Sequence, residues 1–215
     1  MSDTFQTVIR LSRQGASLLA KGDTTASILS LRSALTHLKS LVDGETVLPS
    51  LQSWRITTMP VPHEQGSHSS NNSTSCELFS HCFLIMPMPC HEKVPTHDKY
   101  ALLSAALLFN VALAYHLRGP LNDSQRIAMN MYAKAANLLQ RLDITSDGSA
   151  VMLAICNNMA AMALEDLDLQ AFAVYRQTIG SYLSITETTG AFYLAFFAGN
   201  FAATEAVHQR PAPAA

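Results

Sequence analysis

The chain has 215 residues, of which 48% are hydrophobic and 14% are charged, and its formal net charge is −2. A disordered chain needs low hydrophobicity and high net charge, and a protein that binds nucleic acid through its phosphates needs a basic surface. The composition argues against both classes. The length fits one domain that carries a large insertion.

The chain opens with a helical pattern. Apolar residues recur at three- and four-residue steps through residues 1–44, with a break at Gly22-Asp23, and this predicts a first helical hairpin. Residues 45–98 are rich in Gly, Pro, Ser and Asn and contain no convincing run of alternating strand residues. We predict that they form an irregular insertion that is partly disordered.

The helical pattern returns in residues 99–207. It predicts two further hairpins and a final helix, over residues 100–117, 124–142, 150–164, 169–185 and 191–207, all in one domain. Residues 208–215 form a tail that we expect to be disordered. The start of the final helix, from Ala191 to Phe197, is apolar nearly all round, so either the insertion or another molecule must cover it.

The three hairpins share a spacing of small and bulky residues. The second helix of each carries a small residue, a bulky residue and another small residue at A-x-x-x-Y-x-x-A spacing: Ser27, Leu31 and Ala34, then Ala128, Tyr132 and Ala135, then Ala171, Tyr175 and Thr178. Each follows a helix with a small central residue, which is Gly15, Ala112 or Ala160. Two helices can cross closely only where side chains are short, and a ring then fills the neighbouring hollow.

In this spacing the sequence resembles the tetratricopeptide-repeat (TPR) family. The match is closest from Asn110 to Tyr115 and from Ala128 to Ala135, and the chain looks like a group of TPR-like proteins with a similar phrase around residues 109–117. The resemblance implies an all-α fold of stacked helical hairpins, a short α-solenoid interrupted by the long insertion.

The resemblance also implies a groove for an extended peptide or a partner helix, lined by the first helix of each hairpin. In the family, the residue two positions before the small residue often faces that groove. Asn110, Asn158 and Asn200 occupy this place, and Arg13 takes it in the first hairpin. Few cations accompany them, so we expect apolar contacts and amide hydrogen bonds to dominate.

Two roles are open for these asparagines. An amide can hold a ligand's backbone because it donates and accepts at once, or it can bond a carbonyl inside the packed helices. If the asparagines bind a ligand, Asn110→Ala and Asn158→Ala are expected to weaken partner capture and to leave thermal stability largely intact.

The insertion gathers His and Cys residues, which are His63, His68, His81, His91, His97, Cys76, Cys82 and Cys90. Imidazole and thiolate are the natural ligands of zinc, but the spacing of these residues differs from that of common structural zinc sites. A regulatory metal-binding unit is therefore the alternative function, and no metal ligand is assigned. The apolar run from Leu78 to Met86 is expected to dock against the helices as an extended piece.

We expect no enzymatic activity and no cofactor. The sequence has no nucleophile elbow, no phosphate-binding glycine loop and no H-E-x-x-H helix. Cys156 lies on an apolar helix, where a core role is expected, and the apolar stretch from Ala101 to Tyr115 is shorter than the ~20 residues of a membrane span. The sequence thus predicts a soluble intracellular protein, cytoplasmic or nuclear, that binds another protein or a peptide and neither nucleic acid nor a membrane.

Overall fold

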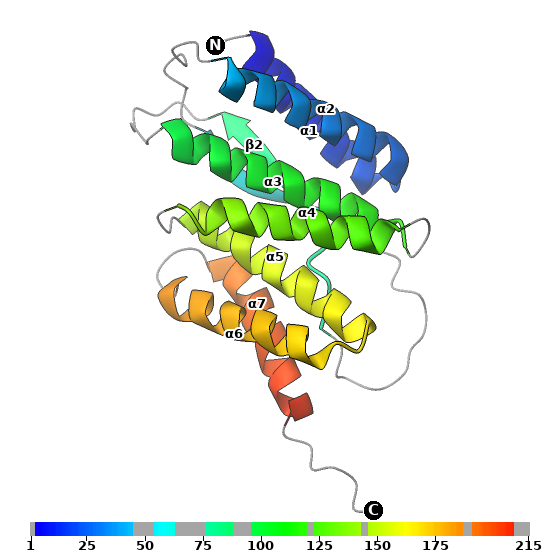
Figure 1. Cartoon of the computed structure of the whole chain (residues 1–215), viewed down its shortest axis with the longest axis vertical. Coiled ribbons are helices and arrows are strands. Elements are labelled where there is room, and N and C mark those ends of the chain that lie inside the picture. The colour runs from blue at the N-terminus through cyan, green and yellow to red at the C-terminus, as the bar shows by residue number, and fades with distance from the viewer. Residues whose placement is uncertain are drawn as a thin grey trace, which may run out of the picture. The chain divides into compact units, whose positions relative to one another are not determined.

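The computed structural model describes residues 3–44, 54–62, 76–87, 96–119, 123–142, 146–186 and 191–208. Their elements in chain order are α1 (Asp3–Ala20), α2 (Thr24–Asp43), β1 (Trp54–Pro60), β2 (His81–Pro87), α3 (Thr96–Leu117), α4 (Ser124–Leu139), α5 (Ser146–Glu165), α6 (Leu169–Thr186) and α7 (Ala191–His208) (Figure 1). The described residues are mainly helical, and every predicted helix is present, so the all-α class is confirmed broadly. The predicted tail lies, except for its first residue, outside the described residues.

Two strands interrupt the segment that was predicted to be irregular. β1 and β2 pair antiparallel, with Trp54 opposite Pro87 and Pro60 opposite His81. The expectation of an insertion without strands is wrong here, because β2 does not alternate. Cys82 and Phe83 are adjacent and both are buried, so the strand has no polar face for a period-two pattern to reveal.

The chain divides into two compact units. Unit 1 comprises Met1–His63 and Ser80–Val151, and unit 2 comprises Glu64–Phe79 and Met152–Ala215. Unit 1 therefore holds α1 to α4 and the β1–β2 sheet, whereas unit 2 holds most of α5, then α6 and α7. Each unit is described by itself below.

In unit 1, α1 and α2 cross closely at Gly15. A Cβ atom on Gly15 would lie 2.5 Å from Cγ of Leu31, which is fully buried. The Ser27 hydroxyl donates a hydrogen bond to the Gly15 carbonyl at 2.8 Å. The predicted role of a small residue at the crossing is thus confirmed for the first hairpin.

The second hairpin of unit 1 packs α3 against α4 in the same way. Ala128, Tyr132 and Ala135 of α4 are fully buried, as the spacing predicted. The Tyr132 ring lies 5.5 Å from the ring of Phe109 on α3, measured between centroids. The bulky residue of the pattern therefore fills a hollow beside the small ones.

In unit 2 the third hairpin follows the pattern less closely. Phe172 is buried against Ala160 and Ala163 of α5, whereas Ala171 and Tyr175 are only half-buried beside that cluster. The most buried position of α6 is thus one residue later than the spacing predicted. In α7 the Phe197 side chain is buried, so one side of this apolar helix is covered, as expected.

The turns that close the first and third hairpins are built alike. Gly22 and Leu167 have φ of 81° and 58°, in the left-handed region that favours glycine. The next residue then caps the following helix: Asp23 accepts from the Ala26 N–H and Asp168 from the Ala171 N–H, both at 2.9 Å. This shared turn is a second sign of an internal repeat.

Leu167→Gly is expected to stabilise unit 2. A leucine in the left-handed conformation is strained, and this side chain is 82% exposed, so little packing is lost with it. The expected gain is roughly 0.5–1 kcal/mol, measured by urea unfolding. Leu167→Ala is the matched control, because it removes the side chain and keeps the strain; an equal gain in both variants would assign the effect to the lost leucine surface.

Two helices are long and apolar enough to pass as membrane spans. They cover Asp98–Leu117 and Asp147–Glu165, and 67% and 78% of their apolar windows are buried by the rest of the chain. The apolar stretch from Ala101 to Tyr115 lies inside the first of these helices, which reaches 20 residues only with its flanking residues. Its burial is what one expects of a core helix in a soluble protein.

Candidate functional site

Asn110, in the middle of α3 in unit 1, holds the main chain of β2. Its side-chain oxygen accepts from the Phe83 N–H at 2.8 Å, and its side-chain nitrogen donates to the Phe83 carbonyl at 2.7 Å. Asn110 is fully buried. We call this two-point pairing of one amide with one residue's main chain an asparagine clamp. It satisfies main-chain groups at the edge of β2 that does not pair with β1.

Unit 2 contains a second clamp. Asn158 of α5 accepts from the Phe79 N–H at 2.8 Å and donates to the Phe79 carbonyl at 3.2 Å. Asn158 is fully buried as well. The same chemistry therefore recurs on first helices of successive hairpins.

Further along unit 2, two asparagines converge on one carbonyl. Asn157 and Asn200 each donate to the Glu77 carbonyl at 2.8 Å, and Asn200 also donates to the Asn157 side-chain oxygen at 2.8 Å. Asn200 was predicted from the sequence, whereas Asn157 was not. The doublet Asn157-Asn158 could have indicated it, because two adjacent asparagines on an apolar helix both need hydrogen-bond partners.

Arg13 of α1 reaches β2 in unit 1, but less firmly. Its Nη2 atom lies 3.4 Å from the Ile85 carbonyl oxygen and 3.5 Å from Sδ of Met86. These distances are long, and Arg13 is exposed, so this contact is the weakest of the four.

All four predicted residues thus contact the segment from Glu77 to Met86, each within its own unit. They bond main-chain atoms at residues 77, 79, 83 and 85, which are alternate positions of an extended chain. This is the second role that the sequence left open for the asparagines, with the chain's own segment in the place of a ligand. The expected docking of Leu78–Met86 as an extended piece is confirmed.

Each clamp lies beside a group of packed aromatic rings. In unit 1 the Phe83 ring packs edge-on against Phe109, with centroids 4.9 Å apart. In unit 2 the Phe79 ring lies 5.0 Å from Phe197 and 5.5 Å from Phe196. In each unit the amide thus bonds the main chain, while neighbouring rings pack against the side chain of the same residue.

The thiols near the clamps are uncharged at neutral pH. Burial, with Glu77 nearby, raises the pKa of Cys76 to about 11, and burial raises the pKa of Cys82 and of Cys156 to about 12. Nucleophilic attack and zinc binding both need the thiolate. The arrangement therefore suits neutral hydrogen bonding and apolar contact.

The proposed metal-binding alternative falls largely outside the described residues. Among the residues that the structure describes, no group of three or more His, Cys, Asp or Glu side chains could hold a metal ion. His63, His68, Cys90 and His91 lie outside the described residues, and the side chain of His97 does too. Of the five insertion histidines only His81 is described, and burial lowers its pKa.

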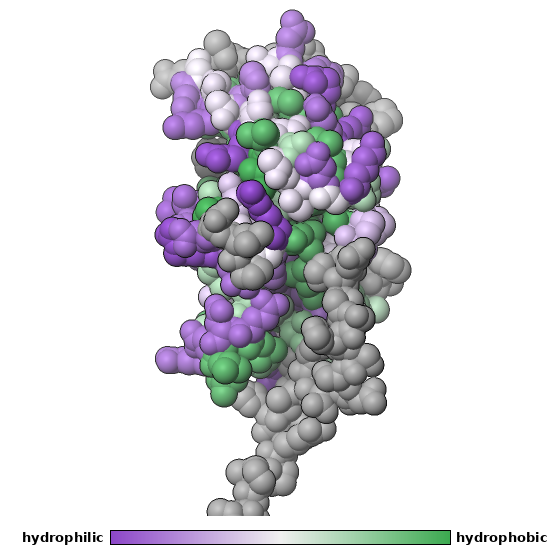
Figure 2. All heavy atoms as spheres, turned by 90° about the vertical axis from the view of Figure 1, so that its right-hand side faces the viewer, coloured by the Kyte–Doolittle hydropathy of each residue, from purple (hydrophilic) through white to green (hydrophobic). Residues whose placement is uncertain are grey.

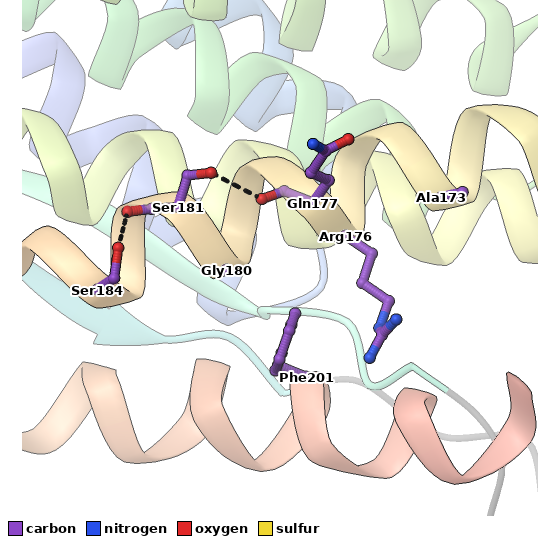
Figure 3. A pocket seen from close by; sticks show the side chains of 7 residues that line it. All are labelled: Ala173, Arg176, Gln177, Gly180, Ser181, Ser184 and Phe201. Atoms are coloured by element: carbon purple, nitrogen blue, oxygen red, sulfur yellow. Dashed lines mark hydrogen bonds between the residues drawn. The ribbon is translucent and has the colours of Figure 1, made fainter. Parts of the chain in front are cut away.

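A hollow of about 470 Å³ lies between α6 and α7 in unit 2 (Figure 3). In Figure 3 Arg176 extends from α6 toward α7, and its guanidinium carbon lies 4.6 Å from the centre of the Phe201 ring. Ser181 and Ser184 donate their hydroxyl hydrogens to carbonyls of α6. The polar groups of the hollow thus already stabilise the helix and the α6–α7 contact, whereas the clamps bind an extended chain.

Among the side chains that the structure describes, the large apolar ones that are exposed lie on α2, on the α5–α6 turn and on α6: Leu29, Val42, Leu167, Leu169 and Val174. Figure 2 shows one face of the molecule, on which hydrophilic and hydrophobic side chains are interspersed.

Comparison with family models, curated proteins and solved structures yields no match for this chain.

Proposed function

We propose that this chain is a TPR-like, non-catalytic protein-interaction module that binds the main chain of an extended peptide through asparagines on its first helices. The observation that carries the proposal is the asparagine clamp. One amide pairs with both main-chain groups of one residue, at Phe83 in unit 1 and at Phe79 in unit 2.

The chemistry of the clamp supports a peptide as the ligand. Every non-proline residue presents an N–H and a C=O, so a clamp accepts any extended chain, and the pocket beside it selects the side chain. The neighbouring surface of α3 is uncharged, since residues 100–117 contain no Lys, Arg, Asp or Glu. An uncharged, extended peptide is thus the ligand that these residues fit best.

The test uses the full chain carrying Phe79→Ala or Phe83→Ala, which weakens the hold of the resident segment and leaves each clamp in place. Immobilised dodecapeptides of random sequence are screened for binding to each variant. We expect micromolar binders that lose affinity when one backbone nitrogen of the peptide is methylated. Methylation removes the N–H group that donates a hydrogen bond to the side-chain oxygen of the clamp asparagine.

Asn130→Ala is the control for changes at the clamps, because Asn130 is exposed on α4. It is expected to leave peptide binding unchanged, while Asn158→Ala in the Phe79→Ala chain reduces it. Circular dichroism verifies that each variant is folded. If no peptide binds in a way that depends on its own backbone N–H groups and on a clamp asparagine, the proposal fails.

A further inference from the structure

In unit 1, β2 lies where a bound peptide would lie. β1 pairs along one edge of β2, with Thr57 opposite Leu84, and Asn110 bonds both main-chain groups of Phe83 on the other edge. In an antiparallel pair, alternate residues turn their main-chain groups toward the partner strand. An incoming strand can therefore satisfy β1 and Asn110 together only in the register of β2.

Two side chains on one face of β2 determine which residues a strand at this site must carry. The Phe83 ring packs edge-on against the Phe109 ring, which in turn packs against the Tyr132 ring. Ile85, two residues later, belongs to the buried cluster that includes Phe5 of α1 and Leu107 of α3. The site thus accepts an aromatic side chain followed at the second position by a branched aliphatic one.

We propose that the partner of unit 1 is an extended segment of another protein that carries this aromatic-x-aliphatic pattern and replaces β2 between β1 and Asn110. The inference rests on the proposed function and names the ligand class of the same clamp. β2 is then the resident occupant, which a partner must displace. Because β2 is tethered, its effective concentration is high, and it lowers the apparent affinity for every external peptide.

The occupant is identified by β2 itself and by the charge of the site. The main-chain bonds are open to any sequence, while the buried side chains, Phe83 and Ile85 on one face of the strand and Cys82 on the other, are the specific part. Since α3 carries no charged residue from 100 to 117, it offers no ionic partner to a charged side chain at either position.

The test measures the anisotropy of a fluorescent peptide with the sequence of residues 80–88, in reducing buffer, titrated with the full chain. The wild-type chain is compared with Phe83→Ala, in which the resident strand loses its ring and the pocket stays. We expect the Phe83→Ala chain to bind the peptide more than about tenfold more tightly than wild type. Binding should be one to one and should leave the chain monomeric in light scattering.

Three matched peptides test the recognition. Replacing Phe83 or Ile85 of the peptide by alanine should each weaken binding by more than about tenfold, and methylating its backbone nitrogen at residue 83 should abolish binding. If the Phe83→Ala chain fails to fold, the wild-type chain is cut once at a protease site inserted within residues 88–95. The cut frees one end of β2, removes its tether on that side and leaves every residue of the site intact.

The outcomes separate the inference from the proposed function. If peptides lacking the aromatic-x-aliphatic pattern bind as well as the parent, and still need their backbone N–H, the function stands and the inference is wrong. If no peptide enters either chain, both are wrong at unit 1 and β2 is a permanent part of the core. If the chain instead forms dimers that the peptide dissociates, the occupant is a second copy and the inference is overturned.

Discussion

Asn110→Ala is expected to destabilise unit 1 by about 2–6 kcal/mol. The substitution leaves the N–H and C=O of Phe83 buried without their partner, at a cost of about 1–3 kcal/mol for each group. Urea unfolding followed by circular dichroism measures the effect. For an Asn110 that only binds a ligand, the sequence predicted weaker partner capture with thermal stability largely intact. The structure instead leads us to expect that Asn110→Ala lowers stability as well.

The control is Asn130→Ala, on the exposed face of α4, where the change is expected to lie within about 0.5 kcal/mol of zero or to be slightly stabilising. Equal effects at Asn110 and Asn130 would mean that the clamp contributes nothing to stability.

Asn110→Asp adds a pH test of the same clamp. The carboxyl group has the shape of the amide, but only its protonated form can donate to the Phe83 carbonyl, and burial also favours the neutral form. The folded-state pKa is therefore raised above the ordinary value of about 3.9. The folded state then binds more protons than the unfolded state, so the unfolding free energy falls as pH rises above about 4.

Measured against wild type over this range, the stability deficit of Asn110→Asp should grow with pH, while that of Asn130→Asp should not grow, because an aspartate there can pair with Arg126 and Lys134 of the same helix. A deficit that shrinks as pH rises would contradict the donor role assigned to the Asn110 amide.

Gly15→Val is expected to cost more than about 3 kcal/mol. Even a single Cβ atom at this position would lie 2.5 Å from Cγ and 2.8 Å from Cδ2 of Leu31, and Leu31 is fully buried. Overpacking one added methyl group costs about 1–3 kcal/mol, and valine adds three carbons at the point where α1 and α2 cross. Urea unfolding measures the loss.

The sign of Gly15→Ala depends on Leu31. In wild type the clash outweighs the gain of roughly 1 kcal/mol that alanine brings to a helix over glycine, so the variant is destabilised. In a Leu31→Ala background the clash is gone, and the same change is expected to stabilise. Gly199→Ala, on α7 with open space around its Cβ, is the control that shows the helix gain alone. If Gly15→Ala destabilises equally in both backgrounds, the close crossing is not its cause.

The helices and the closely packed hairpins could be predicted from the sequence, because both follow from local spacing. The small Gly15 against the bulky Leu31, and Tyr132 between Ala128 and Ala135, are buried as the pattern required. The stacking of the hairpins into a TPR-like solenoid stays a proposal. Local spacing failed at α6, where Phe172 rather than Ala171 is the buried residue, since tertiary packing sets the rotation of a weakly amphipathic helix.

The sequence by itself also indicated which polar side chains of the helices make specific contacts. Arg13, Asn110, Asn158 and Asn200 were predicted from one repeated position, and each contacts the segment Glu77–Met86. The strand β2 was not predicted because apolar side chains lie on both of its faces, so its sequence lacks the alternation of polar and apolar residues that is typical of a strand.

Only the tertiary structure decided what those asparagines hold. An amide can bind a ligand, a neighbouring carbonyl or a distant part of its own chain, and the choice depends on which main-chain groups are left unpaired once the helices have packed. Phe79 and Phe83 lie far from Asn158 and Asn110 in the sequence. Their N–H and C=O groups reach these amides only when the extended segment has packed against the helices, a long-range consequence of packing that local sequence patterns do not carry.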